Sequence, residues 1–236
     1  MTTLAIMQPY LFPYIGYFQL LASVDRFVVY DDVTFIKQGW INRNRMLING
    51  QAAFFTVPLE HRSSAVAIRD TRISDAPQHR QWPEKLMKSF DSAYRRAPEF
   101  VSTRPLVELV LARAGFRIAE LALDSIKTIA DRLEIRTPIV PTSTIYGNGH
   151  LRGEDRVLAI CKAEKASRYV NLAGGRSLYS RERFAAEGIE LCFIEPTPVE
   201  YRQFDDAFVP SLSIVDVLMF NPVDRVRGFL NACEVV

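Results

Sequence analysis

The first thirty residues carry the pattern of a strand, a helix and a second strand. Leu4 to Met7 is a short apolar run, apolar residues recur at helical spacing from Ile15 to Ala22, and Arg26 to Tyr30 is β-branched and aromatic. Two strands about twenty residues apart around one helix form a βαβ unit, in which the strands are parallel and the crossover is right-handed. The start of the chain therefore predicts an α/β fold.

The rest of the chain continues this pattern around a helical centre. Asn49-Gly50 between two apolar runs predicts a β-hairpin over residues 46–57, and Ala67 to Ile73 predicts a further strand. From Gln78 to about Leu133 the spacing is helical, with Pro98 and Pro105 as breaks. Beyond this region we expect strands at 138–140, 168–171 and 190–194, helices at 153–165 and 180–187, and a loop at Gly174-Gly175.

These elements predict a Rossmann-like (HUP-like) parallel sheet with a β-hairpin and a largely helical middle region. The 236 residues suffice for one domain over residues 1–236, with a helical insertion or lid at about 78–134.

Composition narrows the function classes. The chain is 48% hydrophobic and 24% charged, and its net charge of +2 gives no reason to expect generic nucleic-acid binding. No apolar run reaches the ~18 residues of a membrane-spanning helix and no signal peptide is evident, so we expect no membrane insertion and a cytoplasmic location. Cys161, Cys192 and Cys233 lack metal-ligand or disulfide spacing, and the three histidines lack ligand spacing, so no metal site is predicted.

Polar residues follow the first two predicted strands. Gln8, Pro9 and Tyr10 come after the first, and Asp31 and Asp32 after the second. The carboxyl ends of parallel strands share one edge of the sheet, where ligands bind in open α/β folds. Adjacent carboxylates can hold an amine, position a metal or act as a general base, although alternation predicts that at most one of them enters the site. The alternative is a loop carboxylate that caps a neighbouring element.

An aromatic turn leads into the first helix. Tyr14, Gly16 and Tyr17 surround the helix start, where backbone N–H groups can receive a phosphate or carboxylate and a glycine permits close approach. Gly16 can equally serve to pack the helix against its strand.

A cationic, amide-rich segment follows the second strand. Lys37, Asn42, Arg43 and Asn44 offer charge and planar hydrogen-bonding groups for phosphate, carboxylate or amide, and Trp40 offers a stacking face or a packing side chain. We treat Lys37, with Asp31 and Asp32, as a candidate catalytic residue, and the others as binding residues.

Later candidates are more isolated. Glu154 and Arg156 open a helix, Gly174 and Gly175 follow a strand and suit a phosphate contact, and Asp216 is a carboxylate in an otherwise apolar segment that needs a partner. A buried cap or an ion pair with a structural arginine is the alternative for Asp216.

Five stretches of the chain resemble the WbqC-like proteins, in the same order and over essentially the whole length. They are LAIMQPYLFPYIGYFQLL, VVYDDVTFIKQGWINRNRMLING, FFTVPL, GEDRVLAICKAEKASRYVNLAGGRSLY and FVPSLSIVDVLMFN. The resemblance implies an association with bacterial O-antigen and other surface polysaccharides, and attachment of a glycyl or related aminoacyl group to an amino sugar.

The strand, proline-containing loop and Tyr14-Ile-Gly-Tyr17 are also similar to the entry of the HIGH-type nucleotide-binding superfamily. Tyr14 and Tyr17 replace both histidines and no KMSKS loop is evident, so the groups that would stabilise pentavalent phosphate are missing.

Three function hypotheses follow. The first is an acyltransferase acting on an amino sugar or nucleotide-linked amino sugar, with Asp31 or Asp32 as base, Asn42, Arg43 and Asn44 at a phosphate or acyl carbonyl, and Tyr14, Tyr17 and Trp40 around the sugar. The second is an ATP- or nucleotide-binding ligase, in which residues 8–17 and Gly174-Gly175 contact phosphates and Asp31 helps to hold magnesium. The third is a non-enzymatic assembly protein. The cosubstrate would be an activated acyl donor in the first case and ATP with magnesium in the second.

Overall fold

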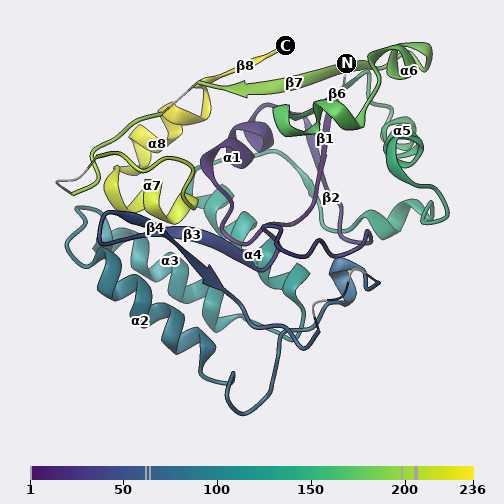
Figure 1. The fold of residues 1–236 in the computed structure, drawn as a ribbon. Coiled ribbons are helices and arrows are strands. Elements are labelled where there is room, and N and C mark those ends of the chain that lie inside the picture. The colour runs from purple at the N-terminus through teal and green to yellow at the C-terminus, as the bar shows by residue number, and fades with distance from the viewer. Residues whose placement is uncertain (1, 62, 64, 198, 205–206) are drawn as a thin grey trace.

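Five parallel strands and one antiparallel strand form the main sheet of this computed structural model, which describes residues 2–61, 63, 65–197, 199–204 and 207–236 (Figure 1). The order is β5-β2-β1-β6-β7-β8, and only β8 runs antiparallel to its neighbour. The strands are β1 (Thr3–Met7), β2 (Arg26–Val29), β5 (Ile139–Val140), β6 (Arg168–Leu172), β7 (Glu190–Pro196) and β8 (Cys233–Val235). The predicted α/β, Rossmann-like class is confirmed.

The βαβ unit at the start of the chain is present as predicted. Helix α1 (Ile15–Ala22) connects β1 to β2, which pair in parallel from Leu4↔Arg26 to Met7↔Val29. Sheet order reverses beside β1, since β2 and β5 lie on one side of it and β6 and β7 on the other. The carboxyl ends of β1 and β6 therefore flank a switch point of the kind that accepts ligands in such sheets.

Two apolar cores cover the two faces of the sheet. Leu4 and Ile6 of β1 face helices α5 (Gly153–Ala163) and α6 (Arg181–Ala186), whereas Ala5, between them, faces the larger core. This alternation is the period-two pattern of a strand buried on both sides.

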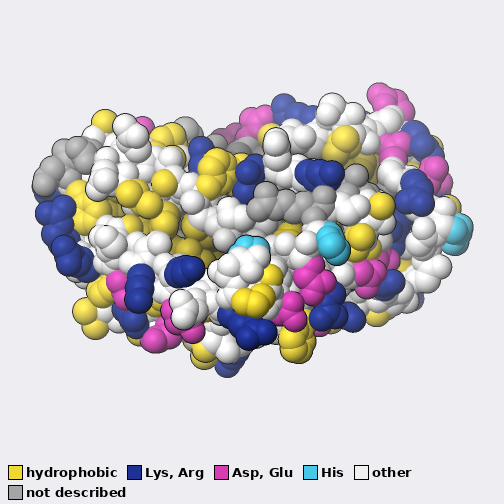
Figure 2. Space-filling view, turned by 60° about the horizontal axis from the view of Figure 1, so that its bottom comes forward, with side chains coloured by type: hydrophobic (Ala, Val, Ile, Leu, Met, Phe, Trp, Pro, Cys, Tyr) yellow, Lys and Arg dark blue, Asp and Glu magenta, His cyan; other side chains and the backbone are white. Residues whose placement is uncertain are grey.

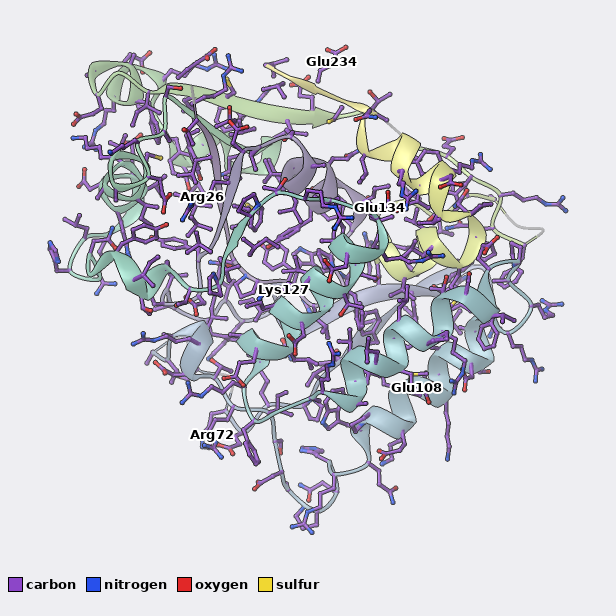
Figure 3. All side chains as sticks on the ribbon, turned by 180° about the vertical axis from the view of Figure 1, so that it is seen from behind. Arg26, Arg72, Glu108, Lys127, Glu134 and Glu234 are labelled. Atoms are coloured by element: carbon purple, nitrogen blue, oxygen red, sulfur yellow. The ribbon has the colours of Figure 1, made fainter. Side chains whose placement is uncertain are left out.

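The larger core joins the remaining helices and the hairpin. Helices α2 (Trp82–Tyr94), α3 (Phe100–Ala112), α4 (Ile118–Arg132), α7 (Ile214–Phe220) and α8 (Val223–Leu230) all contribute buried side chains to it. The hairpin of β3 (Arg43–Ile48) and β4 (Gln51–Thr56) lies between α7 and the pair α2 and α3 (Figure 1). From behind, α4 is seen with Lys127 on it and Glu134 just after its end, where Glu134 pairs with Arg227 of α8 (Figure 3). None of the helices built from described residues is long and apolar enough to cross a bilayer.

Three local predictions were wrong. The strand expected at Ala67–Ile73 is a 3-10 turn, η1 (Ile68–Asp70), with isolated bridges at Ala67, Arg72 and Ile73, because this segment crosses the loop after β2 instead of extending beside a strand. Gly174 and Gly175 lie in a 3-10 helix, η3 (Ala173–Leu178), and not in an open loop. Pro98 separates α2 from α3 as expected, whereas Pro105 lies inside α3.

Candidate functional site

Asp31 is fixed by the residues that follow the neighbouring strand. Because β2 pairs with β5, the loop after β5 lies beside the end of β2. The Oδ1 atom of Asp31 accepts hydrogen bonds from the Thr142 hydroxyl at 2.8 Å and from the Ser143 amide at 3.1 Å. All the hydrogen bonds that the Asp31 side chain makes to described residues go to Oδ1, although the residue is only 6% exposed. The second oxygen, Oδ2, has no hydrogen-bond partner among the described residues and can therefore accept from a ligand.

Asp32 turns to the other side of the strand and forms a buried ion pair. Its Oδ2 lies 2.5 Å from Nη2 of Arg156 in α5, and its Oδ1 accepts from the Ser143 hydroxyl. Arg156 is 3% exposed, donates to Asn148 and lies over the ring of Tyr30 at 5.1 Å. Burial raises the pKa of Tyr30, an effect that Arg156 opposes. An ion pair so fully desolvated holds α5 against the strand end, and loss of either partner is costly.

A cavity of about 360 Å³ opens beside Asp31, between the ends of β2 and β5 and the start of α4. Its polar wall combines two carboxyl groups, Asp31 and Glu120, with two guanidinium groups, Arg69 and Arg117. Thr142 and Thr144 add hydroxyl groups. Cavities of this size accept small ligands, and the mixture of charges suits a molecule that carries both an amine and an acidic group.

Backbone hydrogen bonds bring the two arginines to the strand end. The Arg69 amide donates to the Asp31 carbonyl at 2.8 Å, so η1 lies across the loop after β2. The Ile118 amide donates to Thr71, which anchors the start of α4 beside η1. Arg117, the N-cap residue of α4, makes no side-chain cap, so the positive end of the helix macrodipole adds to the cationic part of the wall. Among the described residues, no group of three or more His, Cys, Asp or Glu side chains is placed to hold a metal ion.

The aromatic turn before α1 is only partly packed within the fold, because Tyr14 and Gly16 line a cavity of about 660 Å³. Tyr17 is buried and donates to the backbone carbonyl of Gln8 at 3.0 Å, while Tyr10 packs against the Tyr17 ring. Burial raises the pKa of Tyr17 well above its usual value, so the phenol remains protonated. Pro9 is buried next to them. Gly16 lies directly under the ring of Tyr14.

The segment from Lys37 to Asn44 also uses most of its polar groups internally. Asn42 donates to the Val57 carbonyl, and Asn44 donates to the carbonyls of Leu11 and Phe12. Arg43 donates to the carbonyls of Gly39 and Gln38 and stacks on Phe54, which in turn stacks on Trp40. Lys37 is exposed. None of these described side chains lines the cavity beside Asp31, so the structure does not bring the segment to Asp31.

The later candidates lie around the other strand ends. Glu154 accepts from the Ser180 amide and pairs with Arg183, which joins α5 to the start of α6. A Cβ on Gly175 would lie 2.9 Å from the Asn171 side chain, so this glycine permits packing, whereas Gly174 has open space around its Cα.

Asp216 is fully buried in α7 and has neither an arginine nor an open cavity beside it in the described part of the chain. It accepts from the Tyr94 hydroxyl at 2.9 Å, the Tyr201 hydroxyl at 2.6 Å and the Gln203 amide at 2.7 Å. Desolvation by burial raises the pKa of Asp216, and these three hydrogen bonds oppose that shift. Hydrogen bonds from three uncharged side chains thus take the place of the ion pair considered as an alternative.

Among the polar residues that line the cavity, sequence reasoning identified only Asp31. Thr142, Ser143 and Thr144 directly follow the predicted strand at 138–140, so the rule that identified Asp31 could have found them. Arg69, Arg117 and Glu120 carry no such signal, because they come from η1 and α4, which lie far from β2 along the chain.

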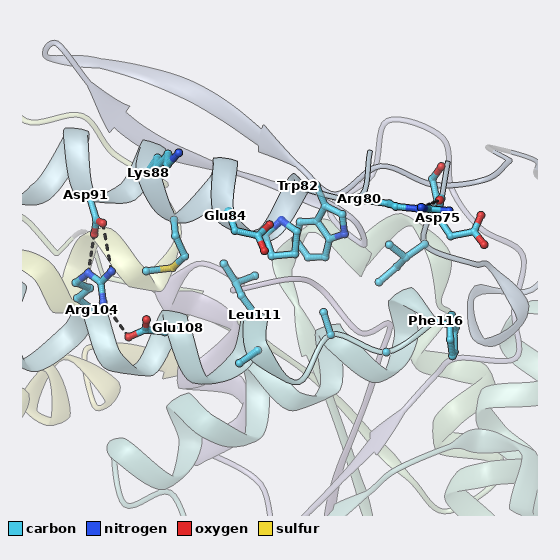
Figure 4. Close-up of a pocket in the computed structure, with 17 residues that line it drawn as sticks. Asp75, Arg80, Trp82, Glu84, Lys88, Asp91, Arg104, Glu108, Leu111 and Phe116 are labelled. Atoms are coloured by element: carbon cyan, nitrogen blue, oxygen red, sulfur yellow. Dashed lines mark hydrogen bonds and ion pairs between the residues drawn. The ribbon is translucent and has the colours of Figure 1, made fainter. Parts of the chain in front are cut away.

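A larger hollow, of about 750 Å³, lies between α2 and α3 and includes Trp82 and Phe116 (Figure 4). Arg104 is turned toward both Asp91 and Glu108 and reaches each at 2.8 Å. Arg104, Asp91 and Glu108 are already paired with one another, and no strand end in the described part of the chain contributes to this hollow. We therefore place the candidate site at the Asp31 cavity.

The fold is that of an α/β protein, with a candidate small-molecule site at the carboxyl edge of its parallel sheet. The chain belongs to the WbqC-like protein family, whose model matches residues 8–228. It is 27% identical to the uncharacterized protein Rv1507c of Mycobacterium tuberculosis, over 99% of this chain and 100% of that protein. No solved structure matches it.

Proposed function

We propose that this protein is an acyltransferase that places an acyl group, such as glycyl or another aminoacyl group, on the amine of an amino sugar or nucleotide-linked amino sugar used in bacterial surface polysaccharides. The observation that carries the proposal is the carboxyl group of Asp31, which has one oxygen anchored by Thr142 and Ser143 and belongs to a residue that lines a cavity together with Arg69 and Arg117. The resemblance to WbqC-like proteins supports the substrate class.

In the proposed reaction, Asp31 binds the ammonium group of the sugar and accepts one of its protons. The free amine nitrogen attacks the carbonyl carbon of an acyl thioester or ester, forming the C–N bond. The C–S or C–O bond of the donor breaks with its electron pair on the leaving group, which takes the proton from Asp31. The second proton that the nitrogen loses as the amide forms passes to solvent water. Arg69, Arg117 and the start of α4 would hold a phosphate or carboxylate of either substrate.

Replacing Asp31 by Asn tests this role. The amide oxygen can still accept from Thr142 and Ser143, so the fold should remain, whereas proton transfer is lost and the rate should fall by about 10²–10⁴-fold. The assay is mass-spectrometric detection of acylated product from a panel of nucleotide-linked amino sugars with acyl-thioester and aminoacyl-ester donors.

Two variants serve as comparisons. Asp224→Asn removes an exposed carboxyl of α8 and should retain the wild-type rate. Asp32→Asn leaves Arg156 buried without its partner and should destabilise the protein by about 3 kcal/mol. Full transfer activity in a folded D31N protein would exclude Asp31 as the base.

A second candidate, an ATP-dependent ligase, rests on the reversal of sheet order between β1 and β6. Gln8 and Gly174 follow these two strands, at the usual position of a nucleotide in doubly wound sheets. Calorimetry with ATP and magnesium separates the candidates, because binding accompanied by pyrophosphate release favours the ligase, and binding of a nucleotide-linked sugar without an ATP response favours the transferase.

A further inference from the structure

A second concave surface, of about 770 Å³, lies between the turn of the hairpin and the C-terminal half of α2. Lys88, Arg95 and Arg96 line it, and we call these three residues and the space between them the basic hollow. In the sequence, the adjacent residues Arg95 and Arg96 suit either a local anion site or solvated surface charge, and exposed charge is the commoner case.

The charges of the basic hollow are not neutralised by the described residues. Lys88, Arg95 and Arg96 form no ion pair with them, and no described carboxyl group lines the hollow. In the space-filling view, Lys and Arg side chains gather along the left edge, where the hairpin turn and the end of α2 lie in Figure 1 (Figure 2). A positive hollow of this kind raises the local concentration of anions.

The helix and the turn supply donors in a fixed arrangement. Lys88 and Ser92 of α2 and Arg95, its C-cap residue, are spaced four and three residues apart, so they lie on one face of the helix. The guanidinium of Arg96 lies 5.3 Å from the centre of the Phe204 ring, which limits its orientations. Opposite them, Asn49 and Gly50 have φ angles of 51° and 73°. The central N–H groups of such a two-residue turn lie outside the strand ladder and can donate to a ligand.

A purely structural explanation accounts for only part of this arrangement. Cations near the C-terminus of a helix are stabilised by its macrodipole, which explains Arg95 and Arg96 at the end of α2. Lys88 lies nearly two turns earlier, beyond the range of that effect, yet it lines the same hollow. Convergence from the helix face and the turn is expected for a ligand site.

We propose that the basic hollow binds phosphoryl groups. Two or three cationic side chains with hydroxyl and backbone N–H donors match the charge and the many acceptor oxygens of a phosphate or diphosphate. Such a group can belong to a free phosphorylated molecule or to the headgroups of an anionic lipid surface. The proposal does not depend on the transferase activity, because no residue of the hollow lines the Asp31 cavity.

The test measures binding of inorganic pyrophosphate by calorimetry, and of vesicles of phosphatidylcholine with phosphatidylglycerol by co-sedimentation. The variant is the double substitution R95Q and R96Q, with K88Q as an independent single variant. The matched control is K127Q with R136Q, which removes two positive charges at exposed positions outside the hollow (Figure 3). Far-UV circular dichroism verifies folding in each case.

We expect saturable binding of at least one probe by the wild-type protein and a loss of about tenfold or more in affinity for R95Q/R96Q and for K88Q. The control should stay within about twofold of wild type, and affinity should fall as salt is raised from about 50 to 200 mM. Binding of pyrophosphate alone would identify a free phosphorylated ligand, and binding of vesicles alone a lipid surface. No binding of either probe, or an equal loss in the control, would overturn the proposal.

Discussion

At the scale of single residues, Gly16 shows why the type of a residue does not determine its role. Its position at a helix start suits either the approach of a phosphate or close packing, and the structure supplies a packing partner. A Cβ on Gly16 would lie 2.4 Å from Cε2 of Tyr14, a distance that requires the ring to move. The glycine therefore allows Tyr14 to fold back over the first turn of α1.

Gly16→Ala should destabilise the protein by about 1–3 kcal/mol, because the added methyl group overpacks this contact. Urea unfolding monitored by circular dichroism measures the change. Gly228→Ala is the control: it lies in α8 with nothing within 4 Å of the added Cβ and should stabilise the protein by about 0.5–1 kcal/mol. An unchanged free energy of unfolding for G16A would show that the Tyr14 ring moves at little cost.

The two asparagines of the cationic segment make a similar point. Their amide groups suggested ligand contacts, yet Asn42 and Asn44 donate to backbone carbonyls of the fold. An asparagine that binds a phosphate and an asparagine that donates to a loop carbonyl are indistinguishable in a sequence, because both use the same side-chain NH2 donors. Asp31 was predictable because its place at a strand end depends only on local pattern.

At the scale of elements, three segments form hydrogen bonds to the loop between β1 and α1. Asn44 of β3 donates to Leu11 and Phe12, Ser125 of α4 accepts from the Phe12 amide, and Ser213, the N-cap of α7, donates to the Phe12 carbonyl. Phe12 has a φ of 43°, so these hydrogen bonds hold a residue in the left-handed region. The hairpin, α4 and α7 thus fix one turn of chain.

Asn44→Ala should lower the free energy of unfolding by about 2 kcal/mol, since it removes donors from buried carbonyl groups. Amide hydrogen exchange should also quicken at Leu11 and Phe12. Ser102→Ala removes an exposed hydroxyl of α3 and should change stability by less than about 0.5 kcal/mol. Unchanged exchange at both amides in N44A would contradict the conclusion that the Asn44 hydrogen bonds hold this loop in place.

Elements with strong local signals were predictable, and those set by tertiary contacts were not. The βαβ unit, the Asn49-Gly50 hairpin and the strands after residue 138 follow from period and turn chemistry. Residues 67–73 have the composition of a strand, but they form only isolated β-bridges to single residues outside the strands. Pro105 remains inside α3 because the carbonyl it leaves without a partner belongs to Val101, which is 85% exposed and can be hydrated.

At the scale of the whole molecule, Asp216 connects distant parts of the larger core. Tyr94 of α2 donates to Asp216 of α7 and accepts from the Leu47 amide of β3, and Tyr201 and Gln203 reach Asp216 from the loop after β7. Burial raises the pKa of Tyr94 and of Tyr201, so both keep the proton that they donate.

This cluster should make global stability depend on pH. Because burial raises the pKa of Asp216, the folded protein binds this proton more tightly than the unfolded chain does. Its contribution to stability is complete below the ordinary value of 3.8 and is lost as pH rises through the raised native pKa. Asp216→Asn removes the titration, so the difference in unfolding free energy between wild type and D216N should fall over that range.

Urea unfolding of both proteins at a series of pH values from about 4 upward gives this difference. Glu234→Gln, on the exposed strand β8, is the control for loss of a carboxyl group alone. A difference that rises with pH would mean that the hydrogen bonds from Tyr201, Gln203 and Tyr94 outweigh desolvation.

The lengths of the two outer strands bear on how copies of this protein behave when crowded together. The sheet ends in β5, of two residues, on one side and in β8, of three residues, on the other. Extension of a sheet by a second chain requires a row of unpaired backbone groups, and such short rows offer few of them. The main sheet should therefore resist extension at its two edges, whereas the separate hairpin of β3 and β4 has longer edges, with six residues in each strand.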